Sequence, residues 1–335
     1  MNIIIPMAGR GTRLRPHTLI TPKPLLPVGG KPIVEWLVKD IIALCPEKVS
    51  KIGFVIGDFG PEVEQALFDI AKNCGAEGNI YYQDKALGTA HAILCAEELL
   101  EGKVIVAFAD TLFKSDYKID TNKDGVIFVQ KVEDPKAFGV VKMDTEGRIT
   151  DFVEKPLDFV SDLAIIGVYY FKDGNFLRRE MQYLIDNDIK EKGEYQLTNA
   201  MENMKNKGAV FYPGEMQEWL DCGHKDATVY TNQRILEFHK NIKQARTGLN
   251  NVNSVIIEPC FIGENVTLEN AVVGPYVSLG NNVKVVQSVI NNSIVLEKSR
   301  IKNKVIENSM IGSNASLKGN AENVSIGDYS IQHHT

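Results

Sequence analysis

The chain has 335 residues, of which 44% are hydrophobic and 24% charged, enough for one large globular domain and a smaller second one. Its formal net charge of -6 argues against nucleic acid or an anionic membrane as the main partner. The five cysteines are scattered and never form a Cys-x-x-Cys pair, so neither a disulfide framework nor a zinc site is expected. No apolar run reaches the length of a membrane span, and we expect a cytoplasmic protein without a membrane partner.

The chain begins with an apolar β-branched run, Ile3–Ile5, that leads into a loop containing Gly9 and Gly11. This pattern predicts a buried parallel strand followed by a tight turn. Because glycine has no Cβ, the backbone of the loop can approach a bulky anion, while Arg13 and Lys23 add positive charge. The loop is neither a Walker loop nor a complete dinucleotide fingerprint. It predicts a phosphate-binding loop, and a basic solvated turn is the alternative.

Helices and strands alternate after this loop. The apolar spacing predicts helices over 33–44, 61–72 and 89–100 and strands over 52–56, 80–83 and 104–109. Such a βαβ rhythm is typical of a parallel sheet covered on both faces, whose functional groups gather at the carboxyl ends of the strands.

Two of these strand ends carry polar residues. Gln83 ends one strand, and Gly88 precedes the next helix. A glutamine amide offers a donor and an acceptor side by side, which match the N3–H and O4 edge of uracil or thymine. Asp110 follows an apolar strand, and Mg²⁺ takes one or two carboxylates together with phosphate oxygens and water. A solvated glutamine and a turn-capping aspartate are the alternatives.

From residue 125 the pattern predicts mostly antiparallel strands, over 125–132, 138–141, 149–154 and 164–171. Helices are expected over 176–186, 197–207 and 225–239. Glu154 and Lys155 stand at a strand end, where an exposed salt-bridging pair is the alternative to a ligand contact. Asp221 ends the strand before the last helix, where a helix cap is the alternative to a functional role, and the two are compatible.

The last eighty residues follow a different pattern. Residues 241–251 are polar and read as a linker. Beyond it, apolar residues recur every six positions in series that begin at Ile256, Val277 and Val305, and the longest series includes Val289. A period of six is the hexapeptide repeat of a β-helix, in which each apolar residue fills a corner of a triangular coil, and roughly four to five coils are expected.

Several motifs together resemble the sugar-1-phosphate nucleotidyltransferases, in particular the glucose-1-phosphate thymidylyltransferase type. They are the Gly-x-Gly-Thr-Arg-Leu loop, the Lys-Pro pair at Lys23, the Leu-Gly-Thr-Ala segment at Gly88, the Glu-Lys-Pro segment at Glu154 and the Trp-x-Asp-x-Gly motif at Asp221. The resemblance implies an α/β fold, with a Rossmann-like, GT-A-like catalytic domain of mixed sheet over 1–240 and a left-handed β-helix over 252–335.

The resemblance also implies a role for each site residue. The implied nucleotide-binding residues are Ala8, Gly9, Gly11, Thr12, Arg13, Gln83 and Gly88. The implied sugar-phosphate-binding residues are Gly139, Glu154, Lys155 and Lys192. The implied catalytic residues are Arg13, Lys23, Asp110 and Asp221, the last two as ligands of Mg²⁺. The implied reaction joins an NTP, dTTP or UTP, to a sugar 1-phosphate such as glucose 1-phosphate, and releases pyrophosphate.

Three residues depart from the family pattern on the sugar side. Thr111 and Asp162 stand where relatives tend to have asparagine, and Lys192 replaces an arginine. Two other functions stay open, a regulatory relative that only senses sugar nucleotides and an acyltransferase in the β-helix, whose histidine base would have to be His333 or His334. The short β-helix, with its open coil faces, predicts a homo-oligomer.

Overall fold

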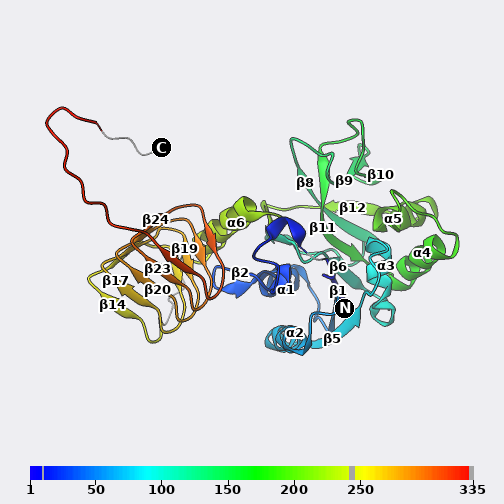
Figure 1. Cartoon of the computed structure of the whole chain (residues 1–335). Coiled ribbons are helices and arrows are strands. Elements are labelled where there is room, and N and C mark those ends of the chain that lie inside the picture. Colours follow the sequence, from blue (N-terminus) through cyan, green and yellow to red (C-terminus); the bar gives the residue numbers. More distant parts are fainter. Residues whose placement is uncertain (10, 241–245, 332–335) are drawn as a thin grey trace. The chain divides into compact units, whose positions relative to one another are not determined.

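The computed structural model describes residues 1–9, 11–240 and 246–331 (Figure 1). The chain divides into two compact units: Met1–Pro27 with Lys31–Thr231, and Val28–Gly30 with Asn232–Thr335. The catalytic domain, linker and β-helix boundaries expected at 240 and 251 remain predictions. Residues 241–245 of the expected linker, as well as His333 and His334, lie outside the described residues.

The first unit is built on a nine-stranded mixed sheet with the order β10-β9-β11-β6-β1-β4-β5, to which β8 and β12 are joined through β11. Its parallel half consists of β1 (Asn2–Pro6), β4 (Lys51–Ile56), β5 (Glu77–Tyr82) and β6 (Val104–Ala107). The rest consists of β8 (Gly125–Lys131), β9 (Gly139–Met143), β10 (Ile149–Glu154), β11 (Leu163–Phe171) and β12 (Phe211–Gly214). β11 joins the halves because it runs antiparallel to β6, β8 and β9. The α/β class with a mixed sheet is confirmed.

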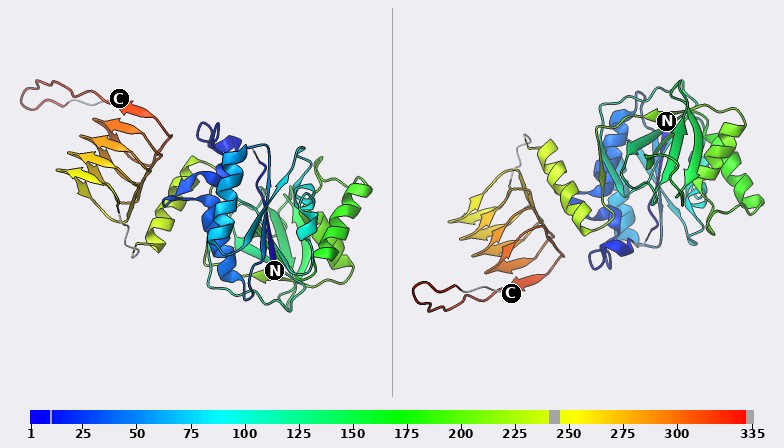
Figure 2. Two further views of the ribbon diagram at one scale, coloured as in Figure 1. Left: turned by 90° about the horizontal axis from the view of Figure 1, so that it is seen from below. Right: turned by 90° about the horizontal axis from the view of Figure 1, so that it is seen from above.

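Helices cover both faces of this sheet, α1 and α2 on one and α3, α4 and α5 on the other (Figure 2). They are α1 (Ile33–Leu44), α2 (Pro61–Asn73), α3 (Thr89–Leu94), α4 (Gly174–Asp186) and α5 (Leu197–Asn206). The apolar strands carry the core, and Ile3, Ile4 and Ile5 are fully buried. α6 (Lys225–Phe238) contains the division between the two units. No helix of the described residues is long and apolar enough to cross a membrane.

The helix expected over 89–100 was wrong in its second half. α3 ends at Leu94, and a separate 3-10 turn covers Glu97–Leu99. Leu99 and Leu100 are both buried. Their amides donate to the carbonyls three residues earlier, Leu99 to Ala96 and Leu100 to Glu97 at 3.0 Å each, which is the bonding of a tighter 3-10 turn and not of an α-helix.

The second unit contains three stacks of parallel strands, the arrangement expected of a left-handed β-helix (Figure 1). The first stack is β14 (Asn250–Val252), β17 (Thr267–Glu269), β20 (Lys284–Val286), β23 (Arg300–Lys302) and β26 (Ser316–Lys318). The second is β15 (Val255–Ile256), β18 (Val272–Val273), β21 (Val289–Ile290) and β24 (Val305–Ile306). The third is β16 (Cys260–Ile262), β19 (Val277–Leu279), β22 (Ile294–Val295) and β25 (Met310–Ile311). Four to five coils were expected, and the stacks agree.

The prediction that apolar residues recur strictly every six positions, which implies eighteen residues in each coil, was wrong. Paired residues of successive coils lie 17, 17, 16 and 16 positions apart in the first stack, not eighteen. Val289 and Val305, which the spacing assigned to the core, are 40% and 82% exposed. Ile290 and Ile306 are buried in their place. A shortened coil moves the apolar position by one residue, and in a strand one residue reverses the face of the side chain.

The second unit also includes a turn from the start of the chain, between β2 (Pro27–Val28) and β3 (Lys31–Pro32). The Gly29 amide donates to Oδ1 of Asn232 at 2.9 Å, and that oxygen also accepts from the Ser278 hydroxyl at 2.6 Å. A Cβ on Gly30 would lie 2.2 Å from the ring of Phe261, so this approach requires glycine. The turn and the buried Asn232 are thus part of the β-helix unit, which the spacing of apolar residues in the sequence did not indicate.

Candidate active site

The glycine loop after β1 is shaped by Gly11. Gly11 has φ 58° and begins the 3-10 turn Thr12–Leu14. Its carbonyl accepts from the Leu14 amide at 3.0 Å and from the Thr18 hydroxyl at 2.7 Å. A Cβ at this position would lie 3.0 Å from Cβ of Lys23. Glycine therefore serves both the left-handed turn and the close approach of Lys23.

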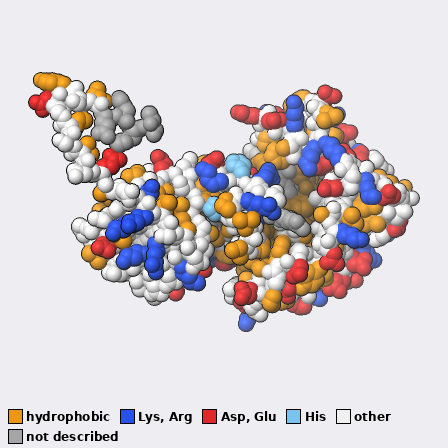
Figure 3. All heavy atoms as spheres, in the orientation of Figure 1, with side chains coloured by type: hydrophobic (Ala, Val, Ile, Leu, Met, Phe, Trp, Pro, Cys, Tyr) orange, Lys and Arg blue, Asp and Glu red, His pale blue; other side chains and the backbone are white. Residues whose placement is uncertain are grey.

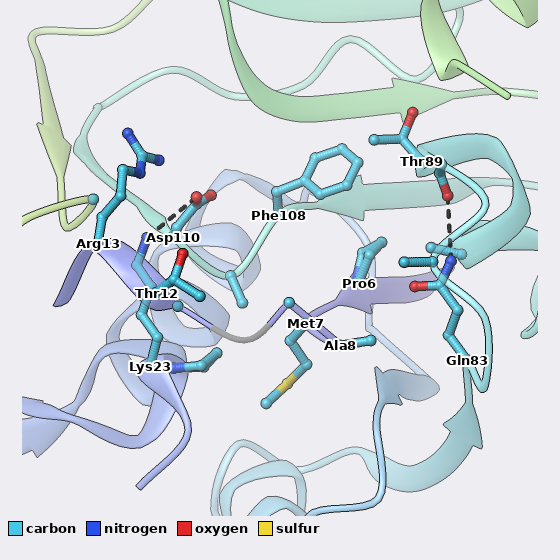
Figure 4. A pocket seen from close by; sticks show the side chains of 18 of the residues that line it. Pro6, Met7, Ala8, Thr12, Arg13, Lys23, Gln83, Thr89, Phe108 and Asp110 are labelled. Atoms are coloured by element: carbon cyan, nitrogen blue, oxygen red, sulfur yellow. Dashed lines mark hydrogen bonds and ion pairs between the residues drawn. The ribbon is translucent and has the colours of Figure 1, made fainter. Parts of the chain in front are cut away.

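A cavity of about 410 Å³ opens at the carboxyl ends of β1, β5 and β6. Nine of the predicted residues line it: Ala8, Gly9, Gly11, Thr12, Arg13, Lys23, Gln83, Gly88 and Asp110. Arg13, Lys23 and Asp110 lie at one side of the cavity and Gln83 at the other (Figure 4). The face of the first unit is hollowed, with lysine and arginine side chains around the hollow (Figure 3). Residues far apart in sequence are thus brought to one site.

Lys23 and Asp110 form an ion pair inside the cavity, with 3.2 Å between Nζ and Oδ2. The Lys23 side chain is only 10% exposed, whereas that of Asp110 is 47% exposed. A buried ammonium needs a counter-charge, which Asp110 supplies. Because Asp110 is half exposed, it can exchange this partner for another cation at low cost.

The strand end that carries Asp110 is held by a bulge in β11. Gly167 has φ 87°, and the pairing of β11 with β8 shifts register around it. The Gly167 carbonyl accepts from the Phe108 amide at 2.9 Å, and the neighbouring Ile166 carbonyl accepts from the Thr111 hydroxyl at 2.7 Å. Thr111 is therefore buried and bound to the backbone, which gives it a structural function at the position where relatives tend to have asparagine.

Asp221 lies beside Asp110 along the backbone. β13 (Glu218–Asp221) pairs with β7 (Thr111–Lys114), and the Cys222 amide donates to the Asp110 carbonyl at 3.2 Å. An Asp221 carboxylate oxygen lies 2.7 Å from where a Cβ on Gly223 would stand, and Gly223 lines the cavity. Near the start of α6, the Ala227 amide donates to Nδ1 of His224 at 3.4 Å, so His224 supplies a helix-capping contact at this end.

Cys222, between these elements, is fully buried, and burial raises the pKa of its thiol to about 12. A thiol with such a pKa stays protonated near neutral pH and is not a nucleophile.

The carboxylates of Asp110 and Asp221 suit a magnesium ion whose remaining ligands come from a substrate and from water. Among the described residues, no group of three or more His, Cys, Asp or Glu side chains is placed to hold a metal. Mg²⁺ is commonly bound by one or two carboxylates and fills its remaining positions with phosphate oxygens and water. Asp110, open to the cavity, and the neighbouring Asp221 match that donor set.

The amide of Gln83 does not offer both of its groups to the cavity. Its Nε2 donates to the Gly88 carbonyl at 3.3 Å and lies 3.2 Å from Nδ1 of His91. Burial lowers the pKa of His91, which favours the neutral imidazole. The sequence suggested that donor and acceptor would both face the base. In the structure the amide nitrogen is bound within the protein, and only the amide oxygen is left for the cavity.

Gly88 is required by backbone packing. It has φ 115°, and a Cβ would lie 2.4 Å from the carbonyl oxygen of Tyr195. Tyr195 also donates its amide to the Leu87 carbonyl at 2.8 Å and accepts from the Ala90 amide at 2.9 Å. The segment that contains Glu194 and Tyr195 is thereby fixed against the loop of Gly88, and Glu194 lines the cavity.

The four predicted sugar-phosphate residues form a second group that does not line this cavity. A Cβ on Gly139 would lie 3.1 Å from Oε2 of Glu154. Lys155 lies 3.5 Å from the other Glu154 oxygen, and the Lys192 ammonium donates to the Lys155 carbonyl at 2.9 Å. The fold therefore brings Gly139, Glu154, Lys155 and Lys192 together. Asp162, the other departure, pairs with Lys131 at 2.9 Å.

Tyr169 packs against the wall of the cavity. Its ring lies edge-on to that of Phe108, which lines the cavity, with 6.1 Å between centroids. Burial raises the pKa of the Tyr169 phenol, and the negative charges of Glu154 and Asp110 raise it further. Sequence reasoning missed Phe108, which is hidden in an apolar strand, and Glu194, although the segment around Lys192 had been singled out.

Comparison with known proteins gives a consistent result. The nucleotidyl transferase family model matches residues 2–237. The chain is 29% identical to glucose-1-phosphate thymidylyltransferase of Streptomyces antibioticus, over 98% of each chain. It is 28% identical to the low-salt glycan biosynthesis nucleotidyltransferase Agl11 of Haloferax volcanii, over 95% of this chain and 94% of the relative.

A solved structure of UDP-glucose pyrophosphorylase complexed with UDP-glucose has the same fold, with a TM-score of 0.59. It is 23% identical, and the match covers 71% of this chain and 98% of that one. The match to the family model covers most of the chain and includes the whole cavity. The chain belongs to the nucleotidyl transferase family and is a sugar-1-phosphate nucleotidyltransferase.

Proposed function

We propose that the chain makes a nucleoside diphosphate sugar from dTTP or UTP and glucose 1-phosphate. A phosphate oxygen of the sugar phosphate attacks the α-phosphorus of the nucleotide, the bond from that phosphorus to the β-phosphate bridging oxygen breaks, and pyrophosphate leaves. The full-length similarity to a glucose-1-phosphate thymidylyltransferase supports this substrate pair. Since the structural relative binds UDP-glucose, UTP stays beside dTTP in the proposal.

The observation that carries the proposal is the ion pair of Lys23 with Asp110 in the cavity formed by the glycine loop. The Lys23 ammonium is held in place by the protein before any ligand arrives, so little is lost in ordering it when a phosphate binds. Arg13 lines the same side and presents a planar guanidinium suited to phosphate oxygens.

In the proposed reaction, the cationic residues of the site bind phosphate and the carboxylates bind the metal. This chemistry asks mainly for positioning and for neutralisation of phosphate charge, and it needs no covalent nucleophile. Lys23 and Arg13 bind the triphosphate and stabilise the departing pyrophosphate. Asp110 and Asp221 hold Mg²⁺. When bound, the ion supplies positive charge to the phosphate oxygens.

The second group of residues suits the sugar phosphate. In the proposed complex, Lys155 and Lys192 bind the attacking phosphate, and the Glu154 carboxylate accepts hydrogen bonds from sugar hydroxyls. Gly139 leaves the sugar room beside the backbone. The Glu154 side chain is 12% exposed and also accepts from the Thr198 hydroxyl at 3.3 Å, which fixes its direction.

For the β-helix unit we propose a function in self-association, as a homo-oligomer. Its second stack exposes Val255, Val289 and Val305 in register on one face. In the last coil, the apolar Leu317 is only partly buried, whereas Leu268 of the second coil is fully buried. Apolar surface of this kind is stabilised when a second copy covers it.

Pyrophosphate release over a matrix of nucleotides and sugar 1-phosphates tests the proposed reaction. With Mg²⁺, we expect the fastest release with dTTP or UTP together with glucose 1-phosphate, and none without a sugar phosphate. Lys23→Met serves as the inactive control, which excludes a contaminating enzyme. Release that is independent of the sugar phosphate would contradict the proposal, because it would indicate hydrolysis.

A further inference from the structure

The amide of Gln83 is anchored at two points on the side of the cavity opposite Lys23 and Asp110 (Figure 4). A carbonyl only accepts hydrogen bonds, so the contact with the Gly88 carbonyl requires the amide nitrogen, not the oxygen, at that place. With the nitrogen there, Nδ1 of His91 at 3.2 Å has to be the acceptor, and the imidazole carries its proton on Nε2.

These two contacts use both hydrogens of the amide nitrogen. Among the residues that the structure describes, the Gln83 oxygen Oε1 accepts no hydrogen bond. Gln83 lines the cavity, so this oxygen is the group left for a ligand. The lowered pKa of His91 keeps the imidazole neutral near pH 7, as an acceptor must be.

We propose that His91 is a positioning residue for selection of the nucleobase: by accepting from Gln83, it keeps the amide oxygen toward the ligand and favours a base that presents a ring N–H. Thymine and uracil present N3–H, and guanine presents N1–H, whereas N3 of cytosine is an acceptor. This inference rests on the proposed binding of a nucleotide in the cavity.

The selection follows from an unfavourable contact with the wrong base. In the position that suits thymine or uracil, cytosine would place its N3 lone pair against Oε1 of Gln83, and two desolvated acceptors would face each other without a hydrogen. Without the His91 acceptor, the Gly88 carbonyl alone holds the amide nitrogen. A turned amide then presents its nitrogen to the base, and cytosine gains a donor for its N3.

Binding of nucleotides to the full-length protein tests the proposal without requiring turnover. Titration calorimetry with dTTP, UTP, CTP and N3-methyl-UTP, in the presence of Mg²⁺, gives a dissociation constant for each nucleotide. The preference is the dissociation constant of CTP divided by that of dTTP or UTP, whichever binds more tightly. We expect His91→Phe to reduce this preference on the order of tenfold, and His91→Asn, whose Oδ1 can accept where Nδ1 did, to restore most of it. Wild type should reject N3-methyl-UTP.

Cys95→Ala is the matched control, because Cys95 contacts the His91 carbonyl through its Sγ at 3.3 Å and not the ring. It should leave the preference unchanged. A folded His91→Phe protein with wild-type preference would overturn the proposal, as would tight binding of N3-methyl-UTP. Nucleotide binding without pyrophosphate release would refute the proposed reaction and leave this test intact, and absence of any nucleotide binding would overturn both.

Discussion

The ion pair of Lys23 and Asp110 predicts that its two partners differ in their effect on stability. Asp110→Asn leaves the Lys23 ammonium, 10% exposed, without its counter-charge. Breaking a fully buried pair in this way costs about 3–5 kcal/mol. Because the Asp110 side chain is 47% exposed, solvent screens the pair, and we expect a loss of about 1–2 kcal/mol in the free energy of unfolding. Lys23→Met leaves only a half-exposed carboxylate and should change stability by less than about 0.5 kcal/mol.

Both variants should nevertheless lose at least about a hundredfold in turnover, the order expected when a major electrostatic group is removed. Urea unfolding followed by circular dichroism measures the stability difference, and pyrophosphate release at saturating substrates measures turnover. Lys131→Met is the control, since the exposed Lys131 pairs with a carboxylate, Asp162, and neither residue lines the cavity. If Lys23→Met destabilised the fold more than Asp110→Asn, or if either variant kept wild-type turnover, this account of the pair would be wrong.

Three further changes test other parts of the structure. Gln83→Glu places a carboxylate oxygen against the Gly88 carbonyl, two acceptors with no hydrogen between them, so the side chain should leave its place and the binding of dTTP and UTP should weaken by about 1–3 kcal/mol; unchanged affinities by calorimetry would remove Gln83 from the base site. Gly88→Ala introduces a Cβ 2.4 Å from the Tyr195 carbonyl at φ 115° and should lower the free energy of unfolding by about 1–3 kcal/mol, and a wild-type melting temperature would show that the loop adapts. Cutting the chain after Gly248 removes Ser278, the hydrogen-bond partner of the buried Asn232, so the shortened protein should have a lower melting temperature. It should also form a smaller assembly by light scattering, and an assembly of unchanged size would exclude the β-helix as its interface.

The parts of the site that sequence predicted depend on local signals. The run Ile3–Ile5 followed by Gly9 and Gly11 specifies a buried strand and a turn within a few residues, and the structure contains both. Asp110 and Gln83 could be placed at the same edge of the sheet because parallel strands end together.

The parts that sequence did not predict depend on contacts between distant residues. The direction of the Gln83 amide is set by His91 and by the Gly88 carbonyl, and spacing alone does not reveal which group of an amide faces the protein. The inclusion of Val28–Gly30 in the β-helix unit depends on Asn232, about two hundred positions later. The register of Val289 depends on a coil length that only the stacked strands define.

The central claim is that the cavity joins a sugar phosphate to the α-phosphate of a nucleotide. Incubation of the full-length protein with dTTP or UTP labelled at the α-phosphate, with glucose 1-phosphate and Mg²⁺, tests it directly. The account predicts that the label moves into a nucleoside diphosphate sugar while unlabelled pyrophosphate is released, and that Lys23→Met abolishes the transfer. Label that stays in the triphosphate, or that appears only in a nucleoside monophosphate, would contradict the claim.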